Sequence, residues 1–144
     1  MYRKDEIHPL DYIFGSLSCK VVELNEHSKE GNWIKKYMYN SRGMESRRIE
    51  NIFKIEREDD TQKFKASSQP GNRKLLWHGT NTSNILSIIK NGMLIDAPFA
   101  NKTGRSYGNG IYFADILDKS LGYSSGDYVL LCDVELGACK VSWS

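Results

Sequence analysis

The chain contains at residues 74–80 the stretch Lys74-Leu75-Leu76-Trp77-His78-Gly79-Thr80, a short apolar run that leads directly into histidine and glycine. The apolar part is typical of a buried β-strand. The next residues predict a helix, because Thr82 or Ser83 can serve as its N-cap and Gly92 stands where a left-handed C-terminal cap is expected. The inward-facing residues of this helix are expected to be Ile85, Leu86, Ile88 and Ile89. The imidazole of His78 and the unobstructed backbone of Gly79 are therefore expected together at the C-terminal end of this strand.

Outward from this stretch, alternating apolar and polar residues predict several more strands. They cover residues 17–23, 48–58, 110–114, 128–134 and 139–143, and in the second of them Phe53 and Ile55 share one face. Ser28 is expected to cap a helix that ends at 40–43, with an apolar stripe of Trp33, Ile34, Tyr37 and Met38. Gly31 should weaken this helix by about 1 kcal/mol relative to alanine.

Two further segments complete the secondary-structure prediction. A brief helix is expected around Lys119, Ser120 and Tyr123, and residues 66–72 are expected to form an exposed loop. At least five strands with few helices indicate an α+β domain built around sheets.

The composition limits the class of protein. The 144 residues suffice for one domain, because a chain of this length buries about 68–70% of its unfolded surface. Hydrophobic residues make up 40% and charged residues 26%, which is ordinary for a globular protein. No segment approaches the apolar length of a spanning helix, and the polar start lacks the apolar run of a secretory signal. The formal net charge of +2 is too small to indicate a nucleic-acid-binding protein by itself.

The cysteines and two of the histidines indicate no metal or disulfide chemistry. Cys19, Cys132 and Cys139 form an odd set without Cys-x-x-Cys spacing, so neither a disulfide framework nor a zinc site is expected. We expect reduced thiols with structural roles in an intracellular protein. His8 and His27 have no partner at metal-ligand spacing and are predicted to lie at the surface.

Several short motifs follow one another in a fixed order. After the 74–80 stretch come Ala97-Pro98, Thr103-Gly104, the run Gly108-Asn109-Gly110-Ile111-Tyr112-Phe113-Ala114-Asp115, then Lys119-Ser120 and Tyr123. Two glycines spaced in this way before a strand do not form a Rossmann or P-loop phosphate site, which needs a glycine-rich turn leading into a helix. In combination, however, the motifs resemble the catalytic domain of the poly(ADP-ribose) polymerases, the diphtheria-toxin-like ADP-ribosyltransferases.

This resemblance covers nearly the whole chain. It is ungapped from Leu75 to Ser124, and His8-Pro9-Leu10-Asp11 and the segment 52–58 also look like that family. The chain is most similar to the polymer-forming, DNA-damage-responsive branch, which implies a part in DNA repair. The implied fold is an ADP-ribosyltransferase fold of two packed, mainly antiparallel sheets with few short helices. Residues 1–144 would form a partial catalytic domain, incomplete at the C-terminus and without the regulatory helical domain.

The resemblance also implies an activity and a set of site residues. The family transfers ADP-ribose from NAD, bound as substrate without a metal, to protein acceptors and releases nicotinamide. The catalytic residues implied are His78 and Tyr112. The implied NAD-binding residues, with the same two included, are His78, Gly79, Thr80, Tyr112, Ser120 and Tyr123.

Each site residue has an implied task. The Gly79 backbone and the Ser120 hydroxyl would bind the nicotinamide carboxamide, Tyr123 would stack on the ring and Tyr112 would pack behind it. His78 would bind the adenosine ribose, and Thr80 keeps the hydroxyl usual at its position. Taken singly, the same residues also fit ordinary structural roles: half-buried aromatics, a helix hydroxyl and a turn glycine.

The chain departs from the family pattern in three places. The catalytic glutamate of the family lies on a strand beyond Ser144, and Glu135 is not its counterpart, because the acidic residue of the matching strand falls at Asp133. Leu94 replaces an arginine that touches the adenosine side, and Asn109 replaces a lysine. Losing one preorganised electrostatic group raises a barrier by about 2.7–4 kcal/mol, so this chain is expected to be inactive or very slow. The alternative function is therefore a catalytically inactive fragment or pseudoenzyme that binds nicotinamide or ADP-ribose.

Partners and location follow from the same resemblance. Protein acceptors of ADP-ribose are the implied partners, membranes are not, and the location implied is nuclear with the cytosol as the alternative. A third reading is a nucleic-acid-binding domain that uses Arg42, Arg47, Arg48 and Lys54. We expect those residues to be a solvated strand edge instead, so direct nucleic-acid binding is not expected of this domain.

Overall fold

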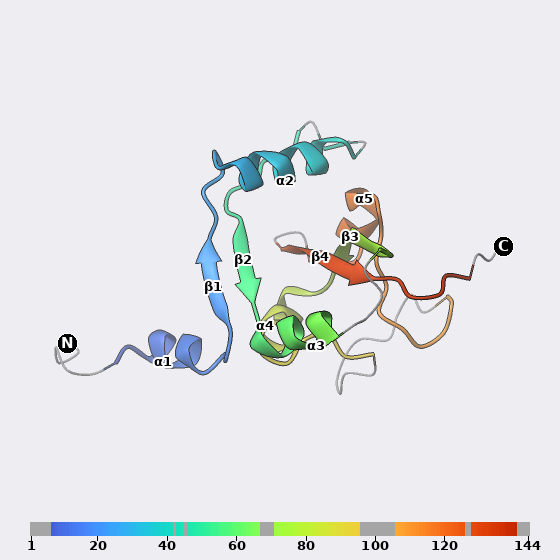
Figure 1. Cartoon of the computed structure of the whole chain (residues 1–144). Coiled ribbons are helices and arrows are strands. Elements are labelled where there is room, and N and C mark those ends of the chain that lie inside the picture. Colours follow the sequence, from blue (N-terminus) through green and yellow to red (C-terminus); the bar gives the residue numbers. More distant parts are fainter. Residues whose placement is uncertain are drawn as a thin grey trace.

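The computed structural model describes residues 7–41, 43–44, 46–66, 71–95, 106–125 and 128–140, and has the predicted α+β class. In chain order the elements are α1 (Pro9–Gly15), β1 (Lys20–Glu23), α2 (Lys29–Tyr39), β2 (Phe53–Glu56), α3 (Glu58–Ala66), β3 (Arg73–Gly79), α4 (Thr82–Asn91), α5 (Leu117–Leu121) and β4 (Val129–Glu135). The strands form two antiparallel two-stranded sheets, β1–β2 and β3–β4. Figure 1 shows the two sheets standing apart, with α2 extending from the first toward α5.

The β3–β4 sheet positions His78 and Gly79 at the C-terminal end of β3. Leu76 lies opposite Cys132 and Gly79 opposite Val129, so the apolar run of β3 pairs with the apolar run of β4. On its other edge, the Trp77 N–H donates to the Ala114 carbonyl at 2.7 Å, and the Ala114 N–H donates back at 2.9 Å. This isolated bridge is all that the structure has of the strand predicted over 110–114. That prediction is wrong because one bridge holds the segment, without a ladder along it.

The β1–β2 sheet is shorter and more polar than the sequence predicts. Its strands pair from Lys20 opposite Glu56 to Glu23 opposite Phe53, so the predicted strands over 17–23 and 48–58 shrink to four residues each. Ile55 is half-buried but Phe53 is 52% exposed. The two residues stand at alternate positions of β2 and so share one face, as predicted, but Phe53 on that face is exposed to solvent.

Helix α2 starts as predicted. The Ser28 side chain accepts from the Gly31 N–H at 3.0 Å, and the helix ends at Tyr39 with Asn40 as its C-cap. Gly31 is not simply a weak helix former, because a Cβ there would lie 2.5 Å from the Asn25 carbonyl oxygen. The chain turns so closely before α2 that only glycine fits at this position.

The core lies where α2, β3 and α5 meet. Its buried members are Met38, Met44, Trp77 and Leu117. Tyr37 stacks on Trp77 with ring centroids 5.6 Å apart, and its hydroxyl donates to the Leu75 carbonyl at 2.7 Å. The last turns of α2 are thereby attached to β3 by both apolar contact and a hydrogen bond.

Three helices differ from the sequence prediction, and α1 was not predicted. Helix α3 was not predicted, and among the loop residues expected over 66–72 Ala66 closes this helix while Gly71 and Asn72 are exposed. In α4 the N-cap is Asn81, whose side chain accepts from the Ser83 N–H at 3.1 Å, so neither Thr82 nor Ser83 is the cap.

The inner face and the end of α4 also need correction. Leu86 is exposed rather than inward-facing, whereas Ile85, Ile88 and Ile89 are half-buried. Gly92 has the expected positive φ of 77°, but its ψ of −178° is extended, so it is not a left-handed cap. The guanidinium of Arg57 occupies the space that a Cβ would need there.

Several sequence predictions concern residues outside the described ranges. These are Ala97, Pro98, Thr103 and Gly104 of the motif series, Arg42, and the end of the strand predicted over 139–143. Cys139 and Lys140, which are described, are not in a strand. None of the helices in the described ranges has the length and apolarity needed to cross a bilayer.

Candidate functional site

The site is built where the end of β3 meets α5. A Cβ on Gly79 would overlap the Ser120 carbonyl oxygen and crowd the Ser120 carbonyl carbon, so glycine is required for β3 to approach α5 this closely. Ser120 is only 4% exposed. The enclosed side-chain polar atoms without a partner in the described residues are Arg57 Nη1 and Trp77 Nε1, so the Ser120 hydroxyl is not one of them. A hydroxyl can both donate to and accept from a polar ligand.

His78 is held in one orientation. Its Nδ1 lies 2.9 Å from the Tyr112 carbonyl oxygen, and its ring tilts against Phe113 at a centroid distance of 5.6 Å. A carbonyl oxygen can only accept, so Nδ1 carries the proton in this hydrogen bond. In the neutral ring Nε2 is then the acceptor, so it can accept a hydrogen bond from a ligand hydroxyl.

The three other predicted residues surround this junction. The Tyr123 N–H donates to the Ser120 carbonyl at 3.1 Å, and the Tyr123 side chain is 64% exposed. The Tyr112 hydroxyl donates to the Gly108 carbonyl at 2.7 Å and accepts from the Tyr107 N–H at 3.1 Å. The Thr80 hydroxyl accepts from the Asn84 side chain at 3.1 Å.

Contacts and chain neighbourhood together bring the six predicted residues into one region of the fold, with Thr80 joined only as the chain neighbour of Gly79. Gly79 meets Ser120 directly, Ser120 meets Tyr123, and His78 meets Tyr112. Tyr123 offers an open ring face, whereas the hydroxyls of Tyr112 and Thr80 are already engaged with protein atoms. Tyr123 can therefore contact a ligand directly, whereas Tyr112 and Thr80 shape the backbone around the ligand.

Two residues of this region escaped the sequence analysis. Phe113 contacts the imidazole of His78, and the Ser125 hydroxyl accepts from the Thr82 N–H at 3.0 Å, which ties the start of α4 to the segment after α5. The order of motifs contained Phe113 without marking it, and Ser125 lies beyond the end of the motifs. Their roles depend on contacts between segments far apart in the chain.

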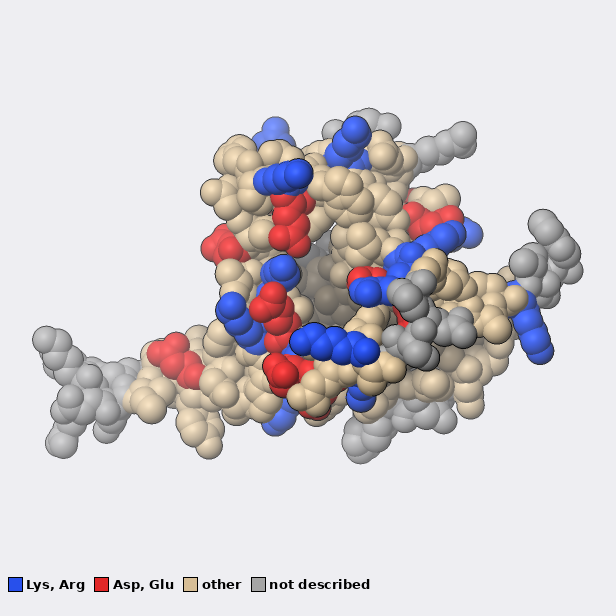
Figure 2. All heavy atoms as spheres, in the orientation of Figure 1, with Lys and Arg blue, Asp and Glu red and all other residues tan. Residues whose placement is uncertain are grey.

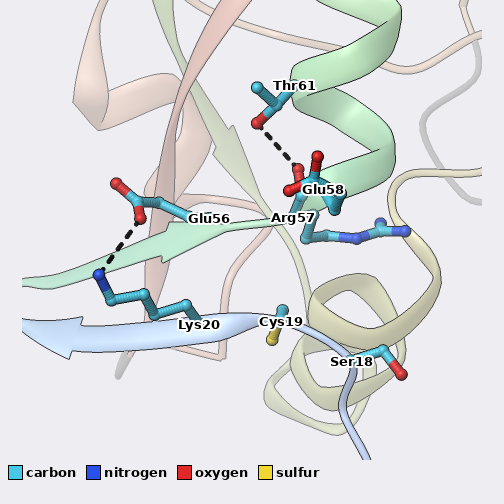
Figure 3. A pocket seen from close by; sticks show the side chains of 7 residues that line it. All are labelled: Ser18, Cys19, Lys20, Glu56, Arg57, Glu58 and Thr61. Carbon is cyan, nitrogen blue, oxygen red and sulfur yellow. Dashed lines mark hydrogen bonds and ion pairs between the residues drawn. The ribbon is translucent and has the colours of Figure 1, made fainter.

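A separate hollow lies away from this region. Its volume is about 560 Å³, and Figure 3 shows its lining: Ser18, Cys19, Lys20, Glu56, Arg57, Glu58 and Thr61. None of the predicted site residues lines it. The Arg57 guanidinium packs against Gly92, while Lys20 pairs with Glu56 at 3.8 Å. Charges of both signs meet here, which gives the hollow no preference for an anion or a cation.

On the face drawn in Figure 2, charges of both signs are mixed. Figure 2 shows Lys, Arg, Asp and Glu side chains interspersed around a hollow on one face. Lys54 lies 3.7 Å from Glu30 and 3.6 Å from Glu56, so it belongs to an ion-pair network. In the described part of the chain, no group of three or more His, Cys, Asp or Glu residues is placed to hold a metal ion.

The acidic residue of β4 is also engaged. Asp133 accepts from the Arg73 Nε at 3.0 Å and also pairs with Arg73 Nη2. The hydrogen bond with Asp133 raises the pKa of Arg73. Because both carboxylate oxygens face the guanidinium across the sheet, Asp133 is held by the fold.

Burial lowers the reactivity of one of the three thiols. The pKa of Cys132 is raised to about 12 by its burial in β4, whereas Cys139 is exposed. Because the thiolate is the reactive form, we expect iodoacetamide near neutral pH to modify Cys139 and to spare Cys132 until the chain is unfolded. Peptide mass spectrometry over a time course measures this. Equal labelling rates under native conditions would contradict the raised pKa of Cys132.

The same shift has a consequence for stability. The ordinary pKa of the thiol is 9.0 and the folded value is about 12. Between these values the unfolded chain has lost the proton that the folded chain keeps, so Cys132 lowers the free energy of unfolding as pH rises through this window. Below it, the thiol contributes no pH dependence.

Comparison with known proteins identifies the family. The family model for the poly(ADP-ribose) polymerase catalytic domain matches residues 28–142. The chain is 34% identical over 143 residues to a poly(ADP-ribose) polymerase of Drosophila melanogaster, covering 92% of this chain and 14% of the relative. It is 37% identical over 139 residues to poly(ADP-ribose) polymerase 1 of Gallus gallus, covering 90% and 14%.

A tankyrase-type poly(ADP-ribose) polymerase of Caenorhabditis elegans is 35% identical over 142 residues, covering 95% of this chain and 6% of the relative. The chain thus spans only a small part of the length of these curated relatives. The matched region contains β3, α5 and all six residues of the candidate site. By this match and by its α+β architecture, the chain belongs to the poly(ADP-ribose) polymerase catalytic-domain family.

Proposed function

We propose that this chain carries the NAD-binding part of a protein ADP-ribosyltransferase, which transfers ADP-ribose from NAD to protein acceptors and releases nicotinamide. The observation that carries the proposal is the close approach of Gly79 to Ser120, with Tyr123 bonded to the same serine. A nicotinamide carboxamide needs one donor and one acceptor in fixed positions, and a backbone beside a hydroxyl supplies both. The exposed face of Tyr123 offers a stacking surface for the ring.

His78 has a matching task on the ribose side. With Nδ1 fixed on the Tyr112 carbonyl, Nε2 is free to accept from a ribose hydroxyl. By the family resemblance, this hydroxyl belongs to the adenosine ribose. The same resemblance implies that the protein is nuclear. Asp133 of β4 supplies no catalytic carboxylate, because it is paired with Arg73.

That pairing favours a second candidate function, a module that binds nicotinamide or ADP-ribose without turnover. Cleavage of the bond between nicotinamide and ribose develops positive charge on the sugar, which a nearby carboxylate must stabilise. By the family resemblance, neither acidic residue of β4 is the catalytic glutamate, so we expect this chain to bind far better than it reacts.

The test measures binding and turnover separately. We expect calorimetry with benzamide, a carboxamide-bearing ring, to detect binding to the wild-type chain, and Tyr123→Ala to weaken it by about three- to tenfold, since an aromatic stack contributes about 0.5–1.5 kcal/mol. Tyr128→Ala is the matched control, because Tyr128 is also exposed and lies nearby in the sequence. Equal affinity in both variants would contradict the assigned ring position.

Incubation with NAD then separates the two functions. Release of nicotinamide with modification of an added protein acceptor supports the transferase. Binding of benzamide without release of nicotinamide supports the binding module.

A further inference from the structure

Helix α5 begins without a cap of its own. Its N-cap residue is Ile116, which makes no side-chain cap hydrogen bond. The first backbone N–H groups of any helix lack partners within the helix. In a water-excluded position such a donor must be satisfied from elsewhere, because an unpaired buried N–H destabilises a fold by about 1–3 kcal/mol.

The missing partner lies just after the C-terminal end of α2. The Leu117 N–H donates to the Ser41 hydroxyl at 3.2 Å, across 76 positions of sequence. Ser41 is 7% exposed and Leu117 is fully enclosed in the core beside Met38 and Met44. The hydrogen bond is therefore shielded from water, and solvent cannot replace it.

The same helix carries the ligand-binding serine of the proposed site. Ser120 lies one turn after Leu117, and the carbonyl of Ser120 both contacts Gly79 and accepts from the Tyr123 N–H. Any shift in the start of α5 would move this carbonyl relative to the end of β3. The contact between Gly79 and Ser120 is too close to absorb such a shift.

A second link makes the arrangement rigid. The hydroxyl of Tyr37, in the last turns of α2, is bonded to the Leu75 carbonyl on β3, while Ser41, two residues after the end of α2, holds the start of α5. The C-terminal part of α2 and the residues just after it thus contact both sides of the candidate site, although none of them belongs to that site.

We propose that Ser41 is a positioning residue, which sets the start of α5 and through it the placement of Ser120 and Tyr123 for a carboxamide-bearing ring. This inference rests on the proposed function for its ligand. Its structural part, the capping of α5 from α2, is independent of the ligand. The expected consequence is that Ser41 controls affinity at a distance.

Three variants test it. We expect Ser41→Ala to weaken benzamide binding by about tenfold, which corresponds to about 1.4 kcal/mol, and Ser41→Thr, which keeps the hydroxyl, to restore it. Ser28→Ala is the matched control, because it removes a serine cap from the other end of α2. It should lower the free energy of unfolding by about 1 kcal/mol while leaving benzamide affinity unchanged.

Amide hydrogen exchange supplies the second readout. Ser41→Ala should accelerate exchange in residues 117–124, and Ser28→Ala should accelerate it at the start of α2 only. Should Ser41→Ala not fold, Ser41→Cys takes its place, because sulfur is a weak hydrogen-bond acceptor. Its exchange in 117–124 should be faster than in the wild-type chain.

The outcomes separate this inference from the proposed function. Wild-type affinity and wild-type exchange in Ser41→Ala would overturn the positioning role. If the wild-type chain does not bind benzamide, the proposed ligand is wrong, and the positioning role of Ser41 is then decided by exchange in α5. Loss of affinity in Ser41→Thr as large as in Ser41→Ala would also overturn it, since the hydroxyl is still present.

Discussion

Replacing Gly79 by alanine is expected to lower the free energy of unfolding by about 3 kcal/mol and to abolish benzamide binding. The added Cβ would overlap the carbonyl oxygen of Ser120, which is a backbone atom and cannot turn aside as a side chain could. To relieve the overlap, β3 and α5 must separate, and the hydrogen-bonded pairing of β3 with both β4 and Ala114 resists that movement. Urea unfolding monitored by circular dichroism measures the change in stability.

Gly110→Ala is the matched control for this prediction. A Cβ at Gly110 meets nothing within 4 Å, and the residue lies in the same glycine-containing motif series. We expect its free energy of unfolding to stay close to the wild-type value. If Gly79→Ala were as stable as Gly110→Ala, the close approach of β3 to α5 would be wrong, and with it the geometry of the candidate site.

The strands and helices that could be predicted are those whose pattern is local. Helix α2 was predictable because a serine cap precedes an apolar stripe, and β3 and β4 because their apolar runs are short and continuous. Helix α3 was missed because it has no apolar stripe. It is supported by acidic residues in its first turn and lysines in its last, which complement the helix dipole.

Other features depend on contacts that no local pattern records. The segment at 110–114 alternates as a strand would, but the structure gives it a single bridge, at Ala114. Gly31 scores as a poor helix residue although the backbone at Asn25 requires it. In both cases tertiary contacts, rather than propensity, decide the outcome.

The candidate site shows the same division. Its six residues could be named from the order of motifs, because the family resemblance supplied their roles and β3 and α5 were both predictable. The sequence did not indicate Ser41, because a serine after a helix is ordinary and its partner Leu117 is 76 positions away. Residues that touch a ligand can be found by motif, whereas residues that place them are found only in the folded chain.

The largest loss of stability is expected from Trp77→Ala. Trp77 is 4% exposed, forms the centre of the core with Met38, Met44 and Leu117, and stacks on Tyr37. Removing such a side chain typically lowers the free energy of unfolding by about 3–5 kcal/mol, and small domains have only about 5–15 kcal/mol in total. We therefore expect Trp77→Ala to be largely unfolded at 37 °C, as measured by thermal denaturation.

Two variants at aromatic positions show why the loss should be specific to packing. Trp33→Ala removes a ring that also stacks on Tyr37, at 5.3 Å, but that is about half exposed, so it should destabilise the fold by only about 1 kcal/mol. Trp77→Phe keeps most of the buried ring and removes the Nε1–H, which is buried without a hydrogen-bond partner in the described structure. The lost volume and the relieved polar group act in opposite directions, so this variant should be much closer to wild type than Trp77→Ala. Equal destabilisation by Trp33→Ala and Trp77→Ala would place the core elsewhere than between α2, β3 and α5.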